Sequence, residues 1–249
     1  MRFHPHEWID QVPSTNTLLL ERIGSGAGAP PGTVLATADQ TGGRGRGRRT
    51  WVSRPGSDLA CSLVLEAAAD PRRLGSLAMA AALGVADCLD EHGLTAQTKW
   101  PNDVIVGRRK IAGILPEQAP GRGRPGLVVV GVGLNLGMRR EEAEAIDQPA
   151  TSVLVETGSA PLPREVLPRL LQRLKPWLEA WGSGGFAALR GGWEERCAGL
   201  GERVTVVDDG ERLSGVLAGF GEEGQLLLEE GGSVGEVWTG SLALGPSTR

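Results

Sequence analysis

The chain has 249 residues, of which 40% are hydrophobic, and its formal net charge is −4. This length allows one substantial hydrophobic core and leaves room for a small second unit. The negative charge balance argues against a nucleic-acid-binding protein, which needs a basic surface to neutralise phosphates.

The sequence favours a cytoplasmic protein without a membrane segment. The N-terminus lacks the basic and then apolar pattern of a signal peptide. The most apolar stretch, residues 74–89, is short and contains Asp87, so we expect a buried helix there. Cys61, Cys88 and Cys197 are odd in number, widely spaced and set in apolar runs, which predicts reduced thiols in the core.

The first predicted element is a helix that begins after Ser14. Serine is a favourable N-cap, an apolar periodic segment follows it, and Gly24 is the expected stop signal. Because a helix start leaves free N–H groups, residues 14–16 can donate hydrogen bonds to a ligand while they cap the helix. An apolar run follows over residues 33–38, and the amide of Gln40 at its end can both donate and accept.

A segment rich in glycine and arginine, Gly42–Arg49, precedes Trp51. Its backbone amides and guanidinium groups suit a polyphosphate. Taken alone, the segment is more typical of a solvated flexible loop, and a nucleic-acid patch is a further interpretation. Its glycine spacing differs from G-x-G-x-x-G, so a dinucleotide fold is not predicted. Trp51 is interpreted either as a hinge that packs when the loop closes or as a lid over a ligand.

Two lysines and a carboxylate lie on the β-hairpin predicted next. Lys99 and Lys110 flank its first strand, and Asp103 stands between them. Exposed lysines on strands usually serve solubility, but Lys110 borders an apolar run and is expected in a cleft. A fixed ammonium there would lower the repulsion between a carboxylate and a phosphate. Trp100 is expected to pack, and Asp103 suits two roles, holding Mg²⁺ or orienting the lysines.

Residues 127–135 predict a buried strand. Gly131 and Gly133 would let another backbone approach it closely, and Asn135 at its end is either packed or near a nucleotide. Two helices are expected after this strand, over residues 163–181 and 185–197.

The composition changes at Gly199–Glu202, which marks a domain boundary. Beyond it, turn signals separate short apolar or alternating segments, which predict a small antiparallel barrel. The expected strands cover residues 203–207, 213–217, 225–229 and 235–238.

The order and approximate spacing of these motifs resemble those of biotin protein ligases, from Glu7 to Ala243. The resemblance rests on Ser14-Thr15-Asn16, Gln40, the Gly-Arg segment, Lys99-Trp100-Pro101-Asn102-Asp103, Lys110-x-x-Gly113 and Gly131-x-Gly133-x-Asn135. It implies an α/β catalytic domain over residues 1–198, with a mixed sheet and flanking helices similar to class II aminoacyl-tRNA synthetases. An SH3-like β-barrel over residues 199–249 would follow it.

The resemblance also implies the activity. Biotin and ATP, with Mg²⁺, would give biotinyl-5′-AMP, and a lysine of a biotin carboxyl carrier protein domain would then take the biotin. The carrier would belong to a biotin-dependent carboxylase, and the ligase would be a monomer or a homodimer without a nucleic-acid partner. The alternative is a lipoate-type ligase, which shares this reaction logic.

Individual residues follow from the same resemblance. The residues expected to act in catalysis are Lys110, Arg46 and Arg44. Those expected to bind biotin are Ser14, Thr15, Asn16, Gln40, Gly43, Arg44, Gly45, Arg46, Lys110 and Gly113. Those expected to bind the nucleotide are Arg46, Arg49, Trp51, Lys99, Asn102, Asp103 and Asn135, with Asp103 as the expected metal ligand.

The sequence departs from the family pattern in three places. Only thirteen residues precede Ser14, too few for a winged helix-turn-helix, which predicts the type that has the ligase activity alone. Arg48 stands where glycine is common, and Pro116 stands where a small or branched apolar residue usually precedes Glu117. These two departures bear on the geometry of the loop and on the end of the hairpin strand.

Overall fold

The computed structural model describes residues 1–47, 49–67, 73–119 and 126–245. Its larger part is a seven-stranded sheet made of β1 (Glu7–Trp8), β2 (Val34–Thr37), β3 (Leu59–Glu66), β4 (Gln97–Lys99), β5 (Asp103–Val106), β6 (Arg109–Gln118) and β7 (Leu127–Leu134). The strand order is β1-β2-β3-β7-β6-β5-β4. β1 runs parallel to β2 and the other neighbours are antiparallel, which confirms the mixed sheet.

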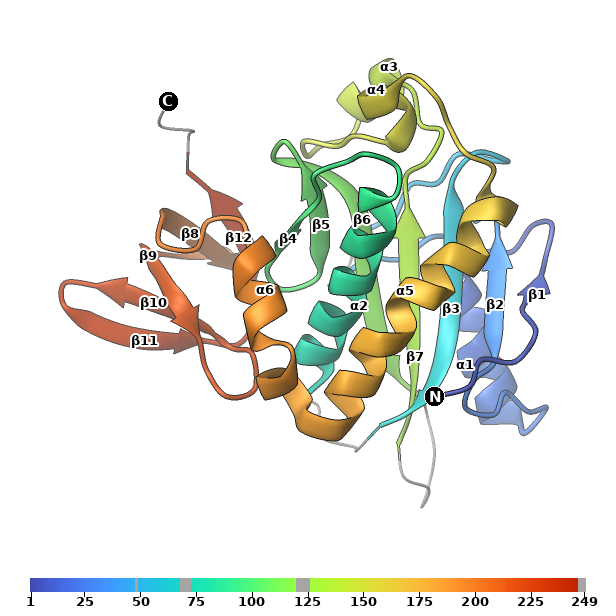
Figure 1. Ribbon diagram of the computed structural model, residues 1–249, viewed down its shortest axis with the longest axis horizontal. Coiled ribbons are helices and arrows are strands. Elements are labelled where there is room, and N and C mark those ends of the chain that lie inside the picture. The colour runs from blue at the N-terminus through green and yellow to red at the C-terminus, as the bar shows by residue number, and fades with distance from the viewer. Residues whose placement is uncertain (48, 68–72, 120–125, 246–249) are drawn as a thin grey trace.

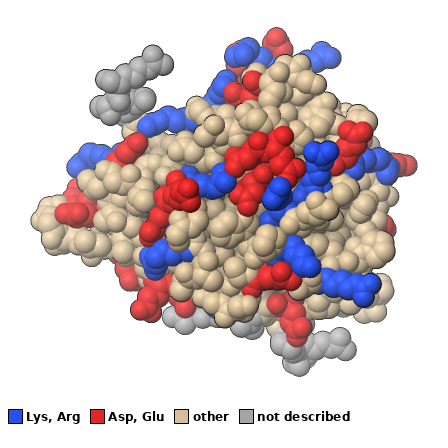
Figure 2. All heavy atoms as spheres, in the orientation of Figure 1, with Lys and Arg blue, Asp and Glu red and all other residues tan. Residues whose placement is uncertain are grey.

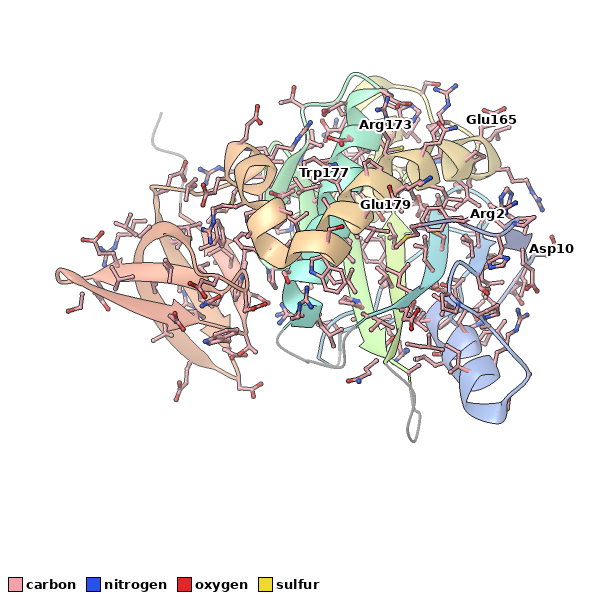
Figure 3. All side chains as sticks on the ribbon, turned by 60° about the horizontal axis from the view of Figure 1, so that its bottom comes forward. Arg2, Asp10, Glu165, Arg173, Trp177 and Glu179 are labelled. Atoms are coloured by element: carbon pink, nitrogen blue, oxygen red, sulfur yellow. The ribbon has the colours of Figure 1, made fainter. Side chains whose placement is uncertain are left out.

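Two long helices, α2 (Arg73–Asp90) and α5 (Pro163–Gly184), cover one face of this sheet (Figure 1). Helix α2 is buried along nearly its whole length, which confirms the buried helix predicted there, because it lies between the sheet and α5. Gly84 marks the crossing point of the two helices, since a Cβ at this residue would lie 2.7 Å from the Cα of Leu174. Trp177 of α5 (Figure 3) donates a hydrogen bond of 2.6 Å to the Asp87 carboxylate of α2.

Helix α1 (Thr15–Ser25) packs on the opposite face of the sheet. Ser14 is its N-cap, as predicted, and its Oγ accepts a hydrogen bond from the N–H of Thr17. The sequence suggested that the helix would end at Gly24, but its C-cap is Gly26. Gly26 adopts the left-handed conformation, with φ of 77°, and its N–H closes the helix onto Ile23, whose side chain packs against the core on this face.

The helix predicted over residues 185–197 is broken into two pieces. A 3₁₀ turn, η1 (Gly185–Ala188), precedes α6 (Arg190–Arg196). The break lies at Leu189, which is buried and belongs to neither piece, while Gly185, with a φ of 60°, ends α5 and begins η1. The short helices α3 (Arg140–Glu144) and α4 (Val153–Thr157) lie together near one edge of the molecule (Figure 1).

The smaller part is a five-stranded antiparallel sheet of order β11-β10-β9-β8-β12. Its strands are β8 (Arg203–Asp208), β9 (Glu211–Phe220), β10 (Leu226–Glu230), β11 (Ser233–Val237) and β12 (Ser241–Leu244). Four of them confirm the predicted segments, while β12 was not predicted. Buried residues of this sheet belong to the same hydrophobic cluster as those of the larger sheet. The domain boundary at residues 198/199 therefore stays a prediction.

Three further findings concern the sequence-based expectations. The three cysteines are free and buried, and burial raises the pKa of each thiol to about 12.

Among the described residues, no helix is both long and apolar enough to cross a bilayer. Acidic and basic side chains are interspersed on the face that carries α2 and α5 (Figure 2).

Candidate active site

A cavity of about 1090 Å³ lies between the larger sheet and the edge strand β12 of the smaller one. The start of α1, the Gly-Arg segment, the strands β4 to β7 and residues 145–149 line it together with β12. It gathers most of the residues that the sequence predicted for the site. These are Ser14, Thr15, Asn16, Gln40, Arg44, Gly45, Arg46, Arg49, Trp51, Lys99, Asn102, Asp103, Lys110 and Gly113.

Two ammonium groups flank one carboxylate in the cavity wall. Lys99 ends β4, Asp103 begins β5 and Lys110 is the second residue of β6, so the pairing of these strands brings the three side chains together. Asp103 Oδ1 lies 2.7 Å from Lys110 Nζ, and Oδ2 lies 3.8 Å from Lys99 Nζ. Burial lowers the pKa of Lys99; the Asp103 charge opposes this shift and the Lys110 charge adds to it. With two cations and one anion, the cluster suits an anionic substrate.

The contacts of Asp103 bear on its two predicted roles. Both carboxylate oxygens face lysine nitrogens. Within the described parts of the chain, no cluster of three or more His, Cys, Asp or Glu side chains is placed to hold a metal ion. Because Mg²⁺ takes oxygen ligands and the neighbours of Asp103 supply ammonium groups, these residues do not fit a protein-held Mg²⁺. The geometry instead favours Asp103 as the group that orients the two lysines.

A polar cluster surrounds the start of α1. The N–H and the Oγ1 of Thr15 both donate to Gln40 Oε1, at 3.0 and 3.2 Å. Ser62 of β3 is fully buried, and its Oγ lies 2.6 Å from both Thr15 Oγ1 and Asn16 Oδ1. A Cβ at Gly131 would lie 2.4 Å from Asn16 Oδ1, so the glycine makes room for this cluster. The cavity therefore has a polar floor beneath its charged wall.

Glu117 joins this floor to the Gly-Arg segment. Its Oε2 accepts hydrogen bonds from Asn16 Nδ2 and from Arg44 Nη2, each at 2.7 Å. No role was predicted for Glu117, which entered the sequence comparison only as the residue after Pro116. Its alternation with Gly113 and Leu115 along β6, all on one face of the strand, was the available signal. Pro116 between them does not end the strand, which continues to Gln118.

The Gly-Arg segment forms a turn over the cavity, in which the N–H of Gly45 donates to the carbonyl of Arg49 at 2.8 Å. Arg46 Nη1 donates to the carbonyl of Gly240 at 2.9 Å and lies 3.4 Å from Asn102 Oδ1. Burial lowers the pKa of Arg46, but a guanidinium remains charged at any physiological pH. Arg48 lies outside the described residues.

Trp51 packs in the cavity wall, where its ring takes the space that a side chain at Gly133 would need. A Cβ on that glycine would lie 2.3 Å from the Trp51 ring. The ring also lies beneath Lys110, whose Nζ is 5.6 Å from its centroid. The glycines of β7 thus admit side chains, Asn16 at Gly131 and Trp51 at Gly133, and not the second backbone that the sequence suggested.

Comparison with known proteins shows the family to which this chain belongs. Residues 8–135 match the pattern of the biotin/lipoate A/B protein ligase family. The biotin–[acetyl-CoA-carboxylase] ligase of Mycobacterium tuberculosis is 34% identical over 244 residues, which cover 94% of this chain and 86% of that protein. The chain belongs to the biotin protein ligases of this family. The biotin protein ligase of Aquifex aeolicus, solved in complex with biotin and ATP, superposes with a TM-score of 0.82 at 30% identity, over 98% of this chain and 100% of that one.

Two residues assigned through the family resemblance lie outside the cavity wall. Gly43 packs behind it, where a Cβ would lie 2.4 Å from the carbonyl oxygen of Trp51. Asn135 is buried, and its Nδ2 donates to the carbonyl of Thr151 at 3.0 Å. Thr151 in turn donates its N–H to the carbonyl of Lys110 at 2.8 Å. The contacts of Asn135 thus favour packing beside Lys110, and its contact with a nucleotide stays a prediction.

Other parts of the site could not be found from the sequence of this biotin protein ligase. Asp58 is buried and accepts hydrogen bonds from the N–H groups of Arg54, Leu136 and Gly137 at 2.8 to 3.0 Å, which ties the stretch just before β3 to the loop after β7. Burial raises the pKa of Asp58, and these hydrogen bonds oppose that shift. Ser62 carried no signal because it stands in an otherwise apolar strand.

Proposed function

We propose that this chain is an ATP-dependent ligase that forms biotinyl-5′-AMP and transfers biotin to a lysine of a carrier protein. One observation carries the proposal: in a chain of this family, the Lys99–Asp103–Lys110 cluster and the arginines of the Gly-Arg segment line one cavity with the polar floor at α1. Cations beside a buried polar pocket suit the joining of a carboxylate to a phosphate.

In the first half-reaction, a biotin carboxylate oxygen attacks the α-phosphorus of ATP. The new O–P bond forms as the bond to the β-phosphate oxygen breaks, and pyrophosphate leaves. Both reacting groups are anionic, so the ammonium of Lys110, with Lys99 and Arg46, stabilises the charge that develops on the phosphate. Asp103 holds Lys110 and Lys99 in place, and no step is assigned to a metal held by the protein.

The polar floor would hold the other end of biotin. Thr15, Asn16 and Gln40 supply N–H, hydroxyl and amide groups, and a cyclic urea both donates and accepts hydrogen bonds. Glu117 and Ser62 fix the amide of Asn16 so that its orientation is set before the substrate arrives. With the ring there, the carboxylate of biotin would extend toward Lys110.

In the second half-reaction, a neutral lysine amine of the carrier attacks the carbonyl carbon of biotinyl-5′-AMP. A C–N bond forms, the C–O bond to AMP breaks, and the amine loses its proton to solvent. The names of the relatives from M. tuberculosis and Paracoccus denitrificans point to a carrier in acetyl-CoA carboxylase. We assign the same class of carrier, the biotin carboxyl carrier domain, to this chain.

Biotin-dependent exchange of labelled pyrophosphate into ATP tests the first half-reaction. The exchange requires biotin and ATP but no carrier, so it isolates adenylation. Lipoate in place of biotin is the matched control, because the family includes lipoate ligases. Exchange with biotin and none with lipoate supports the proposal, and the reverse result would assign the chain to lipoate.

A further inference from the structure

Strand β12 is an edge strand of the smaller sheet and forms one wall of the cavity. It pairs with β8 on one side, and residues 241–245 line the cavity. An edge strand presents backbone groups that its own sheet does not pair. Here, arginines from the larger part of the molecule contact carbonyl groups at both ends of the strand.

Arg46 of the Gly-Arg segment donates to the carbonyl of Gly240, just before β12. Arg108, in the turn between β5 and β6, donates from Nη1 to the carbonyl of Gly245, just after it. Arg108 Nη2 also donates to Glu202 Oε2 at 3.1 Å. The wall strand is thus held at its two ends, at one end by the loop over the cavity and at the other by the hairpin that carries Lys110.

The backbone conformation at position 108 disfavours arginine, which indicates that Arg108 is kept there for the contacts of its side chain. The turn Gly107–Arg108 has positive φ at both residues, 54° and 66°. Such hairpin turns favour glycine or asparagine, because a Cβ is unfavourable at positive φ. An arginine there contradicts the local preference, and unfavourable backbone conformations persist where the surrounding contacts require them.

We infer that Arg108 is a positioning residue that seats β12 against the cavity and thereby maintains the contact between Arg46 and Gly240. The inference goes beyond the proposed function and rests on it in one respect, since the ligand retained behind this wall is the adenylate. When Arg108 is lost, β12 moves more freely, the Gly-Arg segment loses its tether, and the adenylate escapes faster.

The test compares Arg108→Gly with a matched control, Asp209→Gly. Asp209 has a φ of 44° in the β8–β9 turn, so both changes relieve a positive φ, but only the first removes contacts to β12. Hydrogen exchange of residues 241–244 in the free protein is the first measurement. We expect faster exchange in Arg108→Gly and wild-type exchange in Asp209→Gly. Unchanged exchange in Arg108→Gly would overturn the inference whatever reaction the protein catalyses.

Retention of radiolabelled adenylate is the second measurement. Removing a charge-assisted hydrogen bond should speed release about tenfold. If Arg108 acts through Gly240 and Arg46, Arg108→Gly should add little to the release rate of Arg46→Gly. Effects that multiply in the double variant would show independent action and contradict the inference. A wild-type protein that makes no adenylate from biotin and ATP would instead refute the proposed function and leave the exchange result standing.

Arg108→Lys separates the charge from the two-donor geometry. Lysine keeps the positive charge and leaves a side chain at the positive-φ position. Its single ammonium nitrogen cannot reproduce the two guanidinium nitrogens that donate separately to Gly245 and Glu202. We expect an adenylate release rate between those of the wild type and Arg108→Gly, and this variant replaces Arg108→Gly if the glycine variant does not fold. A release rate equal to that of the wild type would show that the paired contact is not required.

Discussion

The carboxylate of Asp103 lies 2.7 Å from the ammonium of Lys110, across two neighbouring strands of one hairpin. The contact fixes the Lys110 charge on a rigid element that lines the cavity. It also explains how a lysine can stay in place before the substrate arrives, since an unpaired ammonium on a four-carbon stem would have many conformations. A preorganised cation of this kind can stabilise charge in a transition state without moving during the reaction.

Lys110→Ala should lower biotin-dependent pyrophosphate exchange by about 10²- to 10³-fold, because it removes a donor to the reacting phosphate. The fold should persist, since the Lys110 side chain is part of the cavity wall and not of the core. Lys175→Ala, on the outer side of α5, is the control and should keep wild-type exchange. Near-normal exchange by Lys110→Ala would remove Lys110 from the proposed mechanism.

Lys99→Met should raise the stability of the protein while it weakens ATP binding. Burial is the main cause of the lowered pKa of Lys99, so the folded state disfavours the ammonium relative to the unfolded state. A lysine whose pKa is lower in the folded state than in the unfolded state reduces the stability of the protein, and the full reduction applies at every pH below the folded-state pKa. The reduction shrinks as the pH rises from the folded-state pKa to the ordinary value.

The gain in Tm from Lys99→Met should therefore be largest at neutral pH and should shrink at alkaline pH. Each kcal/mol gained corresponds to about 2–4 °C for a chain of this size. Scanning calorimetry across this pH range measures the gain, with Lys175→Met as the control for loss of an exposed lysine. A Tm that falls at neutral pH would show that the pairing of Lys99 with Asp103 outweighs its burial.

Local sequence signals predicted those parts of the fold and site that depend on neighbouring residues. The serine cap of α1 works through a hydrogen bond three residues away, and Lys99, Asp103 and Lys110 meet because the consecutive strands β4, β5 and β6 pair with one another. Such short-range relations can be read from residue type and spacing. The same logic placed the end of α1 two residues too early, because two glycines close together offered two possible stops.

Contacts between distant segments could not be read in this way. Arg46 and Gly240 are 194 residues apart, and nothing in either local sequence indicates the other. Ser62 reads as a small residue in an apolar strand, although it joins the polar floor. Tertiary packing decides these positions, so they became visible only when both sheets were placed around the cavity.

Glu117→Gln should raise the KM for biotin about twofold to fivefold. The amide oxygen can still accept from Asn16, but the ion pair with Arg44 is lost, and a pair as exposed as this one is worth little. Glu117→Ala should have a larger effect, because it also leaves the buried amide of Asn16 without this acceptor. Glu7→Gln breaks a similar pair with Arg22 at the other end of α1 and should leave the KM unchanged. Equal KM values for Glu117→Ala and wild type would separate the polar floor from biotin binding.

Arg46→Gly should separate formation of the adenylate from its retention. The guanidinium of Arg46 reaches both Gly240 and Asn102, so its loss frees the Gly-Arg segment on two sides, and the added glycine increases the backbone freedom of a segment already rich in glycine. Pyrophosphate exchange should persist in part, because Lys110 and Lys99 remain in the cavity. The loop should open more often and release a reactive anhydride into solution. Labelled adenylate on the enzyme, followed after gel filtration, should therefore disappear faster than in wild type, and lysines of a bystander protein should become biotinylated. Retention equal to wild type, with label on the carrier lysine alone, would show that Arg46 does not hold the loop closed.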